Sequence, residues 1–209
     1  MYFPYLRGRQ YELIALRELL ENNKLGSAVI PIIEPVRLSP TLVSTLEGFK
    51  DKRQKCSIVM NPGVGSFLEE YSDFSKSNLA TRLDSLIDES ENFYYVSLMS
   101  KDYSLEDNFK SIADIGKQIT VCKKPDDLQG YSKNYMDQET AYNFISEIGR
   151  LKREVQGNKV KIIDNFVKLA RNTDYSDKDD EFFSDDHKYF IEDEYKGFSD
   201  YSIVGEEYS

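Results

Sequence analysis

The residues best suited to chemistry gather near the C-terminal end of the sequence, in the stretch "DYSDKDDEFFSDDHKYFIEDE" (174–194). It holds ten carboxylates, two lysines and the only histidine of the chain, His187. In an extended segment Asp185 and His187 point to the same side, because side chains alternate along a strand. Completed by Asp179, by Asp180 or by a carboxylate at the end of an apolar run such as Asp164, they would provide oxygen-rich ligation with one imidazole. That ligand set suits a divalent cation, namely Mg²⁺, Mn²⁺ or Zn²⁺.

Two other interpretations of this acidic stretch stay open beside the metal site. It is a solvated loop with no chemistry, or it is a surface that faces a protein partner. Such a surface would mimic the charge of nucleic acid and occupy a basic groove on a nuclease or another effector, with binding steered by charge. The candidate partner-binding residues are Asp179, Asp180, Glu181, Asp185, Asp186, Glu192, Asp193 and Glu194.

Three carboxylates form a second group, because each stands at or near the end of an apolar run: Glu34 in "IIEP", Asp164 in "KIID" and Asp200 in "FSDY". In parallel α/β folds the chemistry sits at the carboxyl ends of the strands, where the loops converge. The three are therefore candidate catalytic residues. They would act as acid and base, or hold a cation, in a metal-dependent phosphodiesterase or nuclease. Because a buried carboxylate needs a partner, the alternative is a helix cap or a salt bridge to Arg7, Arg37 or Lys123.

The loop "NPGVGSF" (61–67) is a further candidate site. Its backbone amides follow a strand-like run, and such amides can cradle an anion. Two glycines and a proline are also ordinary turn chemistry. Both interpretations stay open.

The negative charge of the chain is unevenly placed. The net charge is −10, of which residues 174–194 carry −8 and residues 195–209 carry −2. The first 173 residues are therefore neutral as a group. A neutral body with an acidic C-terminal segment lacks the basic surface that phosphate binding requires, so direct nucleic-acid binding is not expected.

The compartment expected from the sequence is the cytoplasm. The opening "MYFPYLRGRQ" has neither a basic leader nor a small-residue cleavage site, which argues against a signal peptide. No window approaches the roughly 20 apolar residues of a membrane span. The two cysteines, Cys56 and Cys122, each lie in a run that reads as a buried strand. Buried reduced thiols are typical of a reducing compartment.

Short apolar runs alternate with longer segments of helical spacing over the first 165 residues. The runs are nearly continuous in apolar residues, which is typical of parallel strands covered on both faces. They span 2–6, 28–36, 56–61, 93–99, 118–122 and 159–164. Helices are predicted over 9–23, 39–49, 78–90, 104–116 and 137–155. This alternation indicates βαβ units and a parallel sheet.

We therefore predict an α/β fold with a (β/α)-barrel-like parallel sheet, complete or incomplete. An open doubly wound sheet is the alternative, but "LRGRQYE" lacks the glycines of a dinucleotide-binding loop. Residues 1–173 would form the barrel-like body. Residues 174–209 would form an acidic excursion, pinned to the body by its aromatic residues and ending in a strand at "FSDYSIVG" (198–205).

Several stretches together resemble a locus-tag-named family of uncharacterised bacterial proteins related to the Beta-protein family of bacteria and phages. They are "YFPYLRGRQYELIALREL", "VIPIIEPV", "DDEFFSDDH" and "GFSDYSIVGEEYS". The resemblance implies a (β/α)-barrel-like fold and a setting among mobile elements or phage defence. It implies no established activity, so it assigns no catalytic residue.

Members of that family continue beyond "GEEYS" through further strands and a last helix. By this comparison the chain is a shortened version, and its barrel is expected not to close. An open sheet edge must be covered, paired in a homodimer or offered to another protein. This expectation favours a protein-binding component of phage–host conflict over an enzyme.

Overall fold

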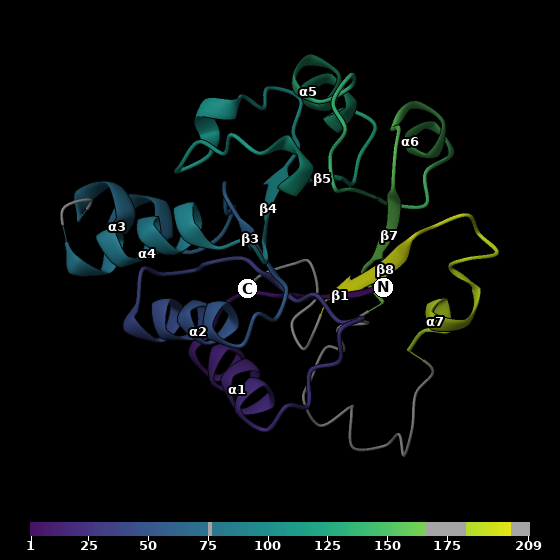
Figure 1. The fold of residues 1–209 in the computed structure, drawn as a ribbon. Coiled ribbons are helices and arrows are strands. Elements are labelled where there is room, and N and C mark those ends of the chain that lie inside the picture. Colours follow the sequence, from purple (N-terminus) through teal and green to yellow (C-terminus); the bar gives the residue numbers. More distant parts are fainter. Residues whose placement is uncertain (75–76, 166–182, 202–209) are drawn as a thin grey trace, which may run out of the picture.

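The computed structural model describes residues 1–74, 77–165 and 183–201. Eight parallel strands form a closed barrel in which each strand lies beside its neighbours in sequence. Figure 1 shows the strands at the centre and the helices around them. The strands are β1 (Tyr2–Leu6), β2 (Ile32–Ile33), β3 (Cys56–Val59), β4 (Phe93–Leu98), β5 (Gln118–Cys122), β6 (Tyr142–Ile145), β7 (Lys159–Ile163) and β8 (Gly197–Tyr201). The predicted (β/α)-barrel-like fold is confirmed.

The barrel closes through β8, which pairs in parallel with both β7 and β1. Ser199 lies opposite Ile162 on one side and opposite Phe3 on the other. The expectation of an unclosed barrel is therefore wrong. The reason is that the acidic C-terminal segment supplies the eighth strand, so the edge that a partner or second copy was expected to cover is occupied from within the chain.

The helices lie outside the barrel. They are α1 (Gln10–Glu21), α2 (Pro40–Asp51), α3 (Phe67–Asp73), α4 (Asn78–Glu89), α5 (Asp127–Asn134), α6 (Gly149–Glu154) and α7 (Asp186–Tyr189), with 3₁₀ turns η1 (Leu105–Asp107) and η2 (Ile115–Lys117). Features predicted from the sequence explain the first two helices, α1 and α2. Leu13, Leu16 and Leu20 form the buried stripe of α1. Ser39 caps α2 by accepting a hydrogen bond from the Leu42 amide at 3.2 Å, with Pro40 at the first helical position.

Two predicted helices are wrong. Residues 137–155 contain strand β6 followed by the short helix α6. The run "YNFI" is too short for periodicity to separate strand from helix, and β5 and β7 provide ladders on both sides of it.

Residues 104–116 contain only η1 and the start of η2. Ser104 accepts a hydrogen bond from the Glu106 amide and Asp114 accepts one from the Gly116 amide. Local bonds of this kind compete with a continuous helix.

The strands are apolar on both faces because each face packs against a separate core. The barrel interior is filled by alternate residues, which include Phe3, Ile32, Val96, Val121 and Phe144. The intervening residues pack against the helices, among them the free thiols of Cys56 and Cys122. Both thiols are buried, as predicted, and burial raises the pKa of Cys56 well above its ordinary value. Among the described residues, no helix is both long and apolar enough to cross a membrane.

Candidate functional site

The candidate site lies at the carboxyl ends of the strands, which we call the barrel mouth. Side chains alternate along a strand, so every second residue of each strand faces the barrel interior. The next inward-facing residue after the last apolar one then lies at the mouth. The series in β1, for example, runs Phe3, Tyr5, Arg7, and that in β7 runs Val160, Ile162, Asp164. The residues placed here are Arg7, Glu34, Asn61, Ser100, Lys123, Ser146, Asp164 and Tyr201.

Glu34 is held by three donors and is only 1% exposed. One carboxylate oxygen pairs with Arg7 and accepts a hydrogen bond from the Tyr5 hydroxyl at 2.8 Å. The other oxygen accepts a hydrogen bond from the Gly63 amide at 2.9 Å. The alternative interpretation of Glu34, a salt bridge to Arg7, is therefore confirmed. Burial, followed by the charge of Glu34, raises the pKa of Tyr5, which stays a neutral donor.

Tyr201 joins two basic side chains across the mouth. The Arg7 guanidinium carbon lies 5.4 Å from the centre of the Tyr201 ring and 5.5 Å from that of Tyr5. The two rings are themselves 4.8 Å apart. The ammonium of Lys123 donates to the Tyr201 hydroxyl at 3.2 Å. Cation–π contacts and this hydrogen bond thus fix the position of Tyr201.

A cavity of about 230 Å³ opens beside this arrangement, at the ends of β5, β6, β7 and β8. Its lining includes a lysine, a serine, a tyrosine and two acidic residues, together with two isoleucines. Such groups can hold a polar ligand and can exchange protons with it. The lining residues are Lys123, Ser146, Glu147, Ile162, Ile163, Asp164 and Tyr201.

Asp200 is not brought to the mouth. It follows Ser199 and precedes the inward-facing Tyr201, so its side chain faces the helical side of β8. There it is 7% exposed and accepts a hydrogen bond from Tyr2 at 2.8 Å. Burial raises the pKa of Asp200. Of the three candidate catalytic carboxylates, the mouth brings together only Glu34 and Asp164, and Glu34 is engaged by protein donors.

The residues proposed for a metal site are arranged differently from the expectation. Residues 186–189 form a short helix, so the extended geometry assumed for Asp185 and His187 is wrong. Ser184 and Asp186 bond locally, and Asp186 pairs with Lys161 at 2.7 Å on the outside of the barrel. Within residues 1–74, 77–165 and 183–201, no group of three or more His, Cys, Asp or Glu side chains is placed to hold a metal ion.

The proposed partner-binding acids divide into three groups. Asp179, Asp180 and Glu181 lie outside the described residues. Asp186 is buried, whereas Asp185, Glu192 and Glu194 are exposed and Asp193 is partly exposed. Three large apolar side chains are exposed on the same stretch: Phe183, Tyr189 and Ile191. We call these six exposed residues, three acidic and three apolar, the α7 surface.

The loop 61–67 uses its amides within the protein. The Gly63 amide donates to Glu34, and the Ser66 amide donates to the Val36 carbonyl at 2.9 Å. Asn61 exchanges two hydrogen bonds with the backbone of Leu98, at 2.8 and 2.9 Å. These contacts support the turn interpretation rather than an anion site.

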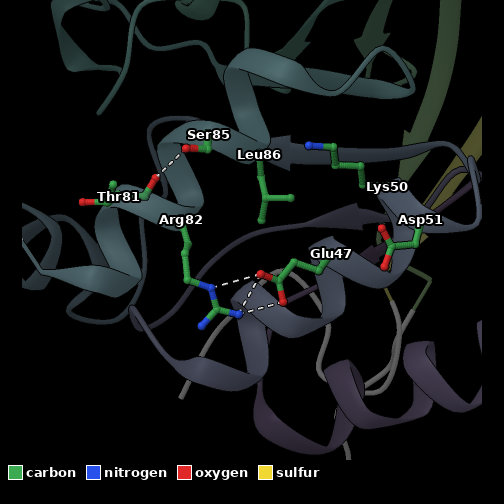
Figure 2. Close-up of a pocket in the computed structure, with 7 residues that line it drawn as sticks. All are labelled: Glu47, Lys50, Asp51, Thr81, Arg82, Ser85 and Leu86. Carbon is green, nitrogen blue, oxygen red and sulfur yellow. Dashed lines mark hydrogen bonds and ion pairs between the residues drawn. The ribbon is translucent and has the colours of Figure 1, made fainter.

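A larger groove lies between α2 and α4, away from the strand ends, and Figure 2 shows the residues that line it. Its most prominent contact is between Arg82 and Glu47, which form a two-pronged ion pair with contacts of 2.7 Å. Lys50 likewise pairs with Glu89. Because these charges neutralise one another, the groove offers no converging set of functional groups.

Comparison of the chain with protein-family models, with curated proteins and with solved structures finds no match. The class of protein is therefore defined by the fold, a closed eight-stranded (β/α) barrel with a polar mouth. Sequence reasoning missed Ser146 because β6 was read as helix. Tyr201 was not predicted, because its neighbour Asp200 is the more obvious chemical candidate. The alternation of side chains along β8 is the signal that separates the two.

Proposed function

We propose that the barrel mouth binds a small polar molecule. The observation that carries the proposal is the convergence of Lys123, Ser146 and Asp164 on one cavity at the carboxyl ends of β5 to β8. Barrels of this architecture bind substrates at that end, which is support by analogy of fold. The cavity, at about 230 Å³, is below the roughly 300–1,000 Å³ of sites for drug-sized ligands. Its ligand is therefore small.

The Arg7–Glu34 pair supports this site without contacting the cavity. Glu34 fixes the guanidinium, and the guanidinium packs on the Tyr201 ring that lines the cavity. Binding sites are most precise when the groups that line them are held by a further layer of contacts. In this proposal Arg7 and Glu34 are positioning residues.

The proposal is tested by melting the purified chain with a library of small polar compounds. A compound that binds only the folded state raises the melting temperature, and the rise grows with the logarithm of the ligand concentration once that concentration exceeds Kd. We expect such compounds for the wild type and not for Ser146→Phe, which fills the cavity. Ser85→Phe, which alters the groove between α2 and α4 instead, is the matched control and keeps the response. Equal responses from Ser146→Phe, or none from the wild type, would contradict the proposal.

A second candidate function is protein binding through the α7 surface, and the exposure of Ile191 favours it. This side chain is 72% exposed, with exposed Tyr189 two residues before it and exposed Glu192 directly after it. Exposed apolar groups rimmed by charge are typical of interaction surfaces. The partner would carry basic charge, as a nuclease or another nucleic-acid-binding effector does. The setting in phage–host conflict rests on the family resemblance alone.

The second candidate is tested by capture from a cell lysate at low and high salt. Charge-steered binding weakens as salt rises. A specific partner is retained by the wild type and by Glu47→Lys, which lies on α2. It is lost from Ile191→Ser and from the double variant Glu192→Lys, Glu194→Lys. If these variants capture the partner as well as the wild type does, the α7 surface is excluded as the binding site.

A further inference from the structure

We infer that the amino end of the barrel, opposite the mouth, binds the phosphate group of a small phosphate monoester. The site goes beyond the proposed function, because it shares no residue with the mouth. It consists of polar side chains at or just before the starts of β3, β4 and β6: Lys55, Ser57, Tyr94 and Tyr142.

The alternation of side chains places these residues on the inner side of the barrel. Ser57, Tyr94 and Tyr142 each stand two residues before a member of the core that fills the barrel interior, so they face inward as well. Lys55 stands two residues before Ser57. In the register of β3 and β4, Ser57 lies directly opposite Tyr94.

Contacts bring three of these side chains into one cluster. The Lys55 ammonium lies 5.8 Å from the centre of the Tyr94 ring, and the rings of Tyr94 and Tyr142 are 6.0 Å apart and edge to face. Burial, followed by the neighbouring Tyr94, raises the pKa of Tyr142, whereas the Lys55 charge lowers it. The positive charge therefore acts on the Tyr142 hydroxyl, which stays a neutral donor.

The polar ends of this cluster are not used within the protein. Among the residues that the structure describes, none bonds the Lys55 ammonium or the hydroxyls of Tyr94 and Tyr142. Lys55 is exposed and both tyrosines are partly exposed, so a ligand can reach all three. An ammonium and two phenol hydroxyls are donors that suit an oxyanion.

Ser57 provides an independent observation. Its side chain is 0% exposed, and within the described part of the chain its hydroxyl has no hydrogen-bond partner. A buried hydroxyl without a partner is costly, so such groups usually bond a ligand or an ordered water. Because Ser57 lies beside Tyr94 at the inner end of the cluster, a bound anion can satisfy it directly or through one water.

The loops around the cluster are basic. Residues 22–31, 52–55 and 90–92, which lead into β2, β3 and β4, carry a net charge of +3. The Gln54 side chain donates to two carbonyls of the first loop, so the first two loops lie side by side. Within the described residues, none of the four cations in these loops has an ion-pair partner. The charged residues are Lys24, Lys52, Arg53, Lys55 and Glu91, all of them exposed.

A phosphate monoester fits this arrangement better than a carboxylate. It carries a charge of about −1.5 to −2 at neutral pH and three strong acceptor oxygens. The cluster offers the three donors of an ammonium and three hydroxyls. A surplus of positive charge in the surrounding loops favours the ligand with the larger negative charge.

The experiment is a titration of the isotope-labelled intact chain at low salt with glycerol phosphate, and with glycerol and acetate in separate samples. We expect glycerol phosphate to cause its largest amide shift changes at the four residues of the site, and glycerol to cause none there. Acetate should bind there at least about tenfold more weakly, since a hydrogen bond to a charged group is worth about that factor or more.

Three variants each remove one kind of donor. Lys55→Met should weaken glycerol phosphate binding about tenfold. The double variant Tyr94→Phe, Tyr142→Phe keeps both rings and should also weaken binding. Ser57→Ala should weaken binding without destabilising the unliganded chain, because the hydroxyl that it removes has no partner among the described residues.

Two control variants carry the same substitutions elsewhere. Lys101→Met removes an exposed lysine that follows β4 at the mouth end of the barrel, and Tyr11→Phe removes an exposed hydroxyl on α1. Both should keep the wild-type affinity for glycerol phosphate. Circular dichroism confirms that each variant is folded.

Unchanged affinity in any of the three site variants overturns the inference, as does an equal loss in Lys101→Met and Lys55→Met. Shift changes confined to the mouth overturn it too and leave the proposed function standing. The last probe is a short single-stranded oligonucleotide without a terminal phosphate. If it binds at the amino end as tightly as glycerol phosphate, the ligand is a phosphodiester backbone and the inference is wrong.

Discussion

Arg7 and Glu34 form a buried ion pair that joins the ends of the first two strands of the barrel. The sequence shows a basic residue just after one apolar run and an acidic residue in the next, and parallel strands bring such positions together. Because Tyr5 and the Gly63 amide also donate to Glu34, the carboxylate is compensated without a metal or a substrate. This pair is therefore part of the framework of the mouth.

Removal of Glu34 should be costly, because it leaves the Arg7 charge buried beside two aromatic rings. We expect Glu34→Ala to lower the free energy of unfolding by about 3–5 kcal/mol. The matched control is Glu47→Ala, which breaks the exposed pair with Arg82 and should cost less than about 1 kcal/mol. Urea denaturation measures both.

The double variant Arg7→Met, Glu34→Ala checks the cause of that loss. With no charge left buried, part of the stability lost in Glu34→Ala should return. Losses that simply add would mean that the two side chains act independently, against the ion pair described here.

The Asp200 carboxyl should make stability depend on pH. Burial, with the nearby charge of Asp186, raises its pKa above the ordinary value of 3.8, although the Tyr2 hydroxyl opposes the shift. A raised pKa means that the contribution of Asp200 to stability is full below the unfolded-state pKa. It is lost as pH rises through the folded-state pKa.

Asp200→Asn stays neutral, so it should lose less stability than the wild type as pH rises from about 4 to neutral. The amide oxygen still accepts a hydrogen bond from Tyr2. Unfolding free energies across this range provide the measurement, and Asp51→Asn, at the exposed end of α2, controls for the loss of one charge. Identical slopes for wild type and Asp200→Asn would contradict the raised pKa.

Lys161 should stabilise the packing of residues 186–195 against the barrel. It projects outward from β7, pairs with Asp186 at 2.7 Å and is itself buried. Lys161→Met leaves Asp186 buried without its cation and should cost about 1.5–3 kcal/mol. It should also speed amide hydrogen exchange over residues 186–195, whereas Lys188→Met, on the exposed face of α7, should not. Unchanged exchange in Lys161→Met would show that other contacts hold the segment.

Gly65 should be irreplaceable in the loop after β3. Its φ is +77°, and a Cβ built there would lie 2.2 Å from the Val36 carbonyl oxygen. Gly65→Ala must therefore shift backbone against backbone and should cost more than about 1 kcal/mol. Gly26→Ala is the control, because a Cβ there meets nothing within 4 Å. If the two alanine variants melt at the same temperature, the described conformation of the loop is incorrect.

The fold was predictable because its signals are local and repeated. Continuous apolar runs such as those that contain Ile58 and Val121 need cover on both faces, which a parallel sheet with helices outside provides. Closure was not predictable, because it depends on one strand at the end of an acidic segment. A strand was predicted over 198–205, but nothing local in this run shows that it pairs with both β7 and β1.

The candidate site was predictable in part for a similar reason. Arg7, Glu34, Lys123 and Asp164 stand at strand ends, and the parallel arrangement assigns them to one mouth. Which side chain faces inward depends on the register of each strand, and that register separates Tyr201 from Asp200. Ser146 could not be placed until β6 was recognised as a strand between β5 and β7.

The most direct test of the mouth as a binding site is an NMR titration of the isotope-labelled intact chain with small polar compounds, charged and uncharged in separate samples. The account predicts that the largest amide shift changes fall at Lys123, Ser146, Glu147, Asp164 and Tyr201, with little change at Glu47, Arg82 and Ser85. Changes that concentrate in the groove between α2 and α4, or no changes in any sample, would contradict it.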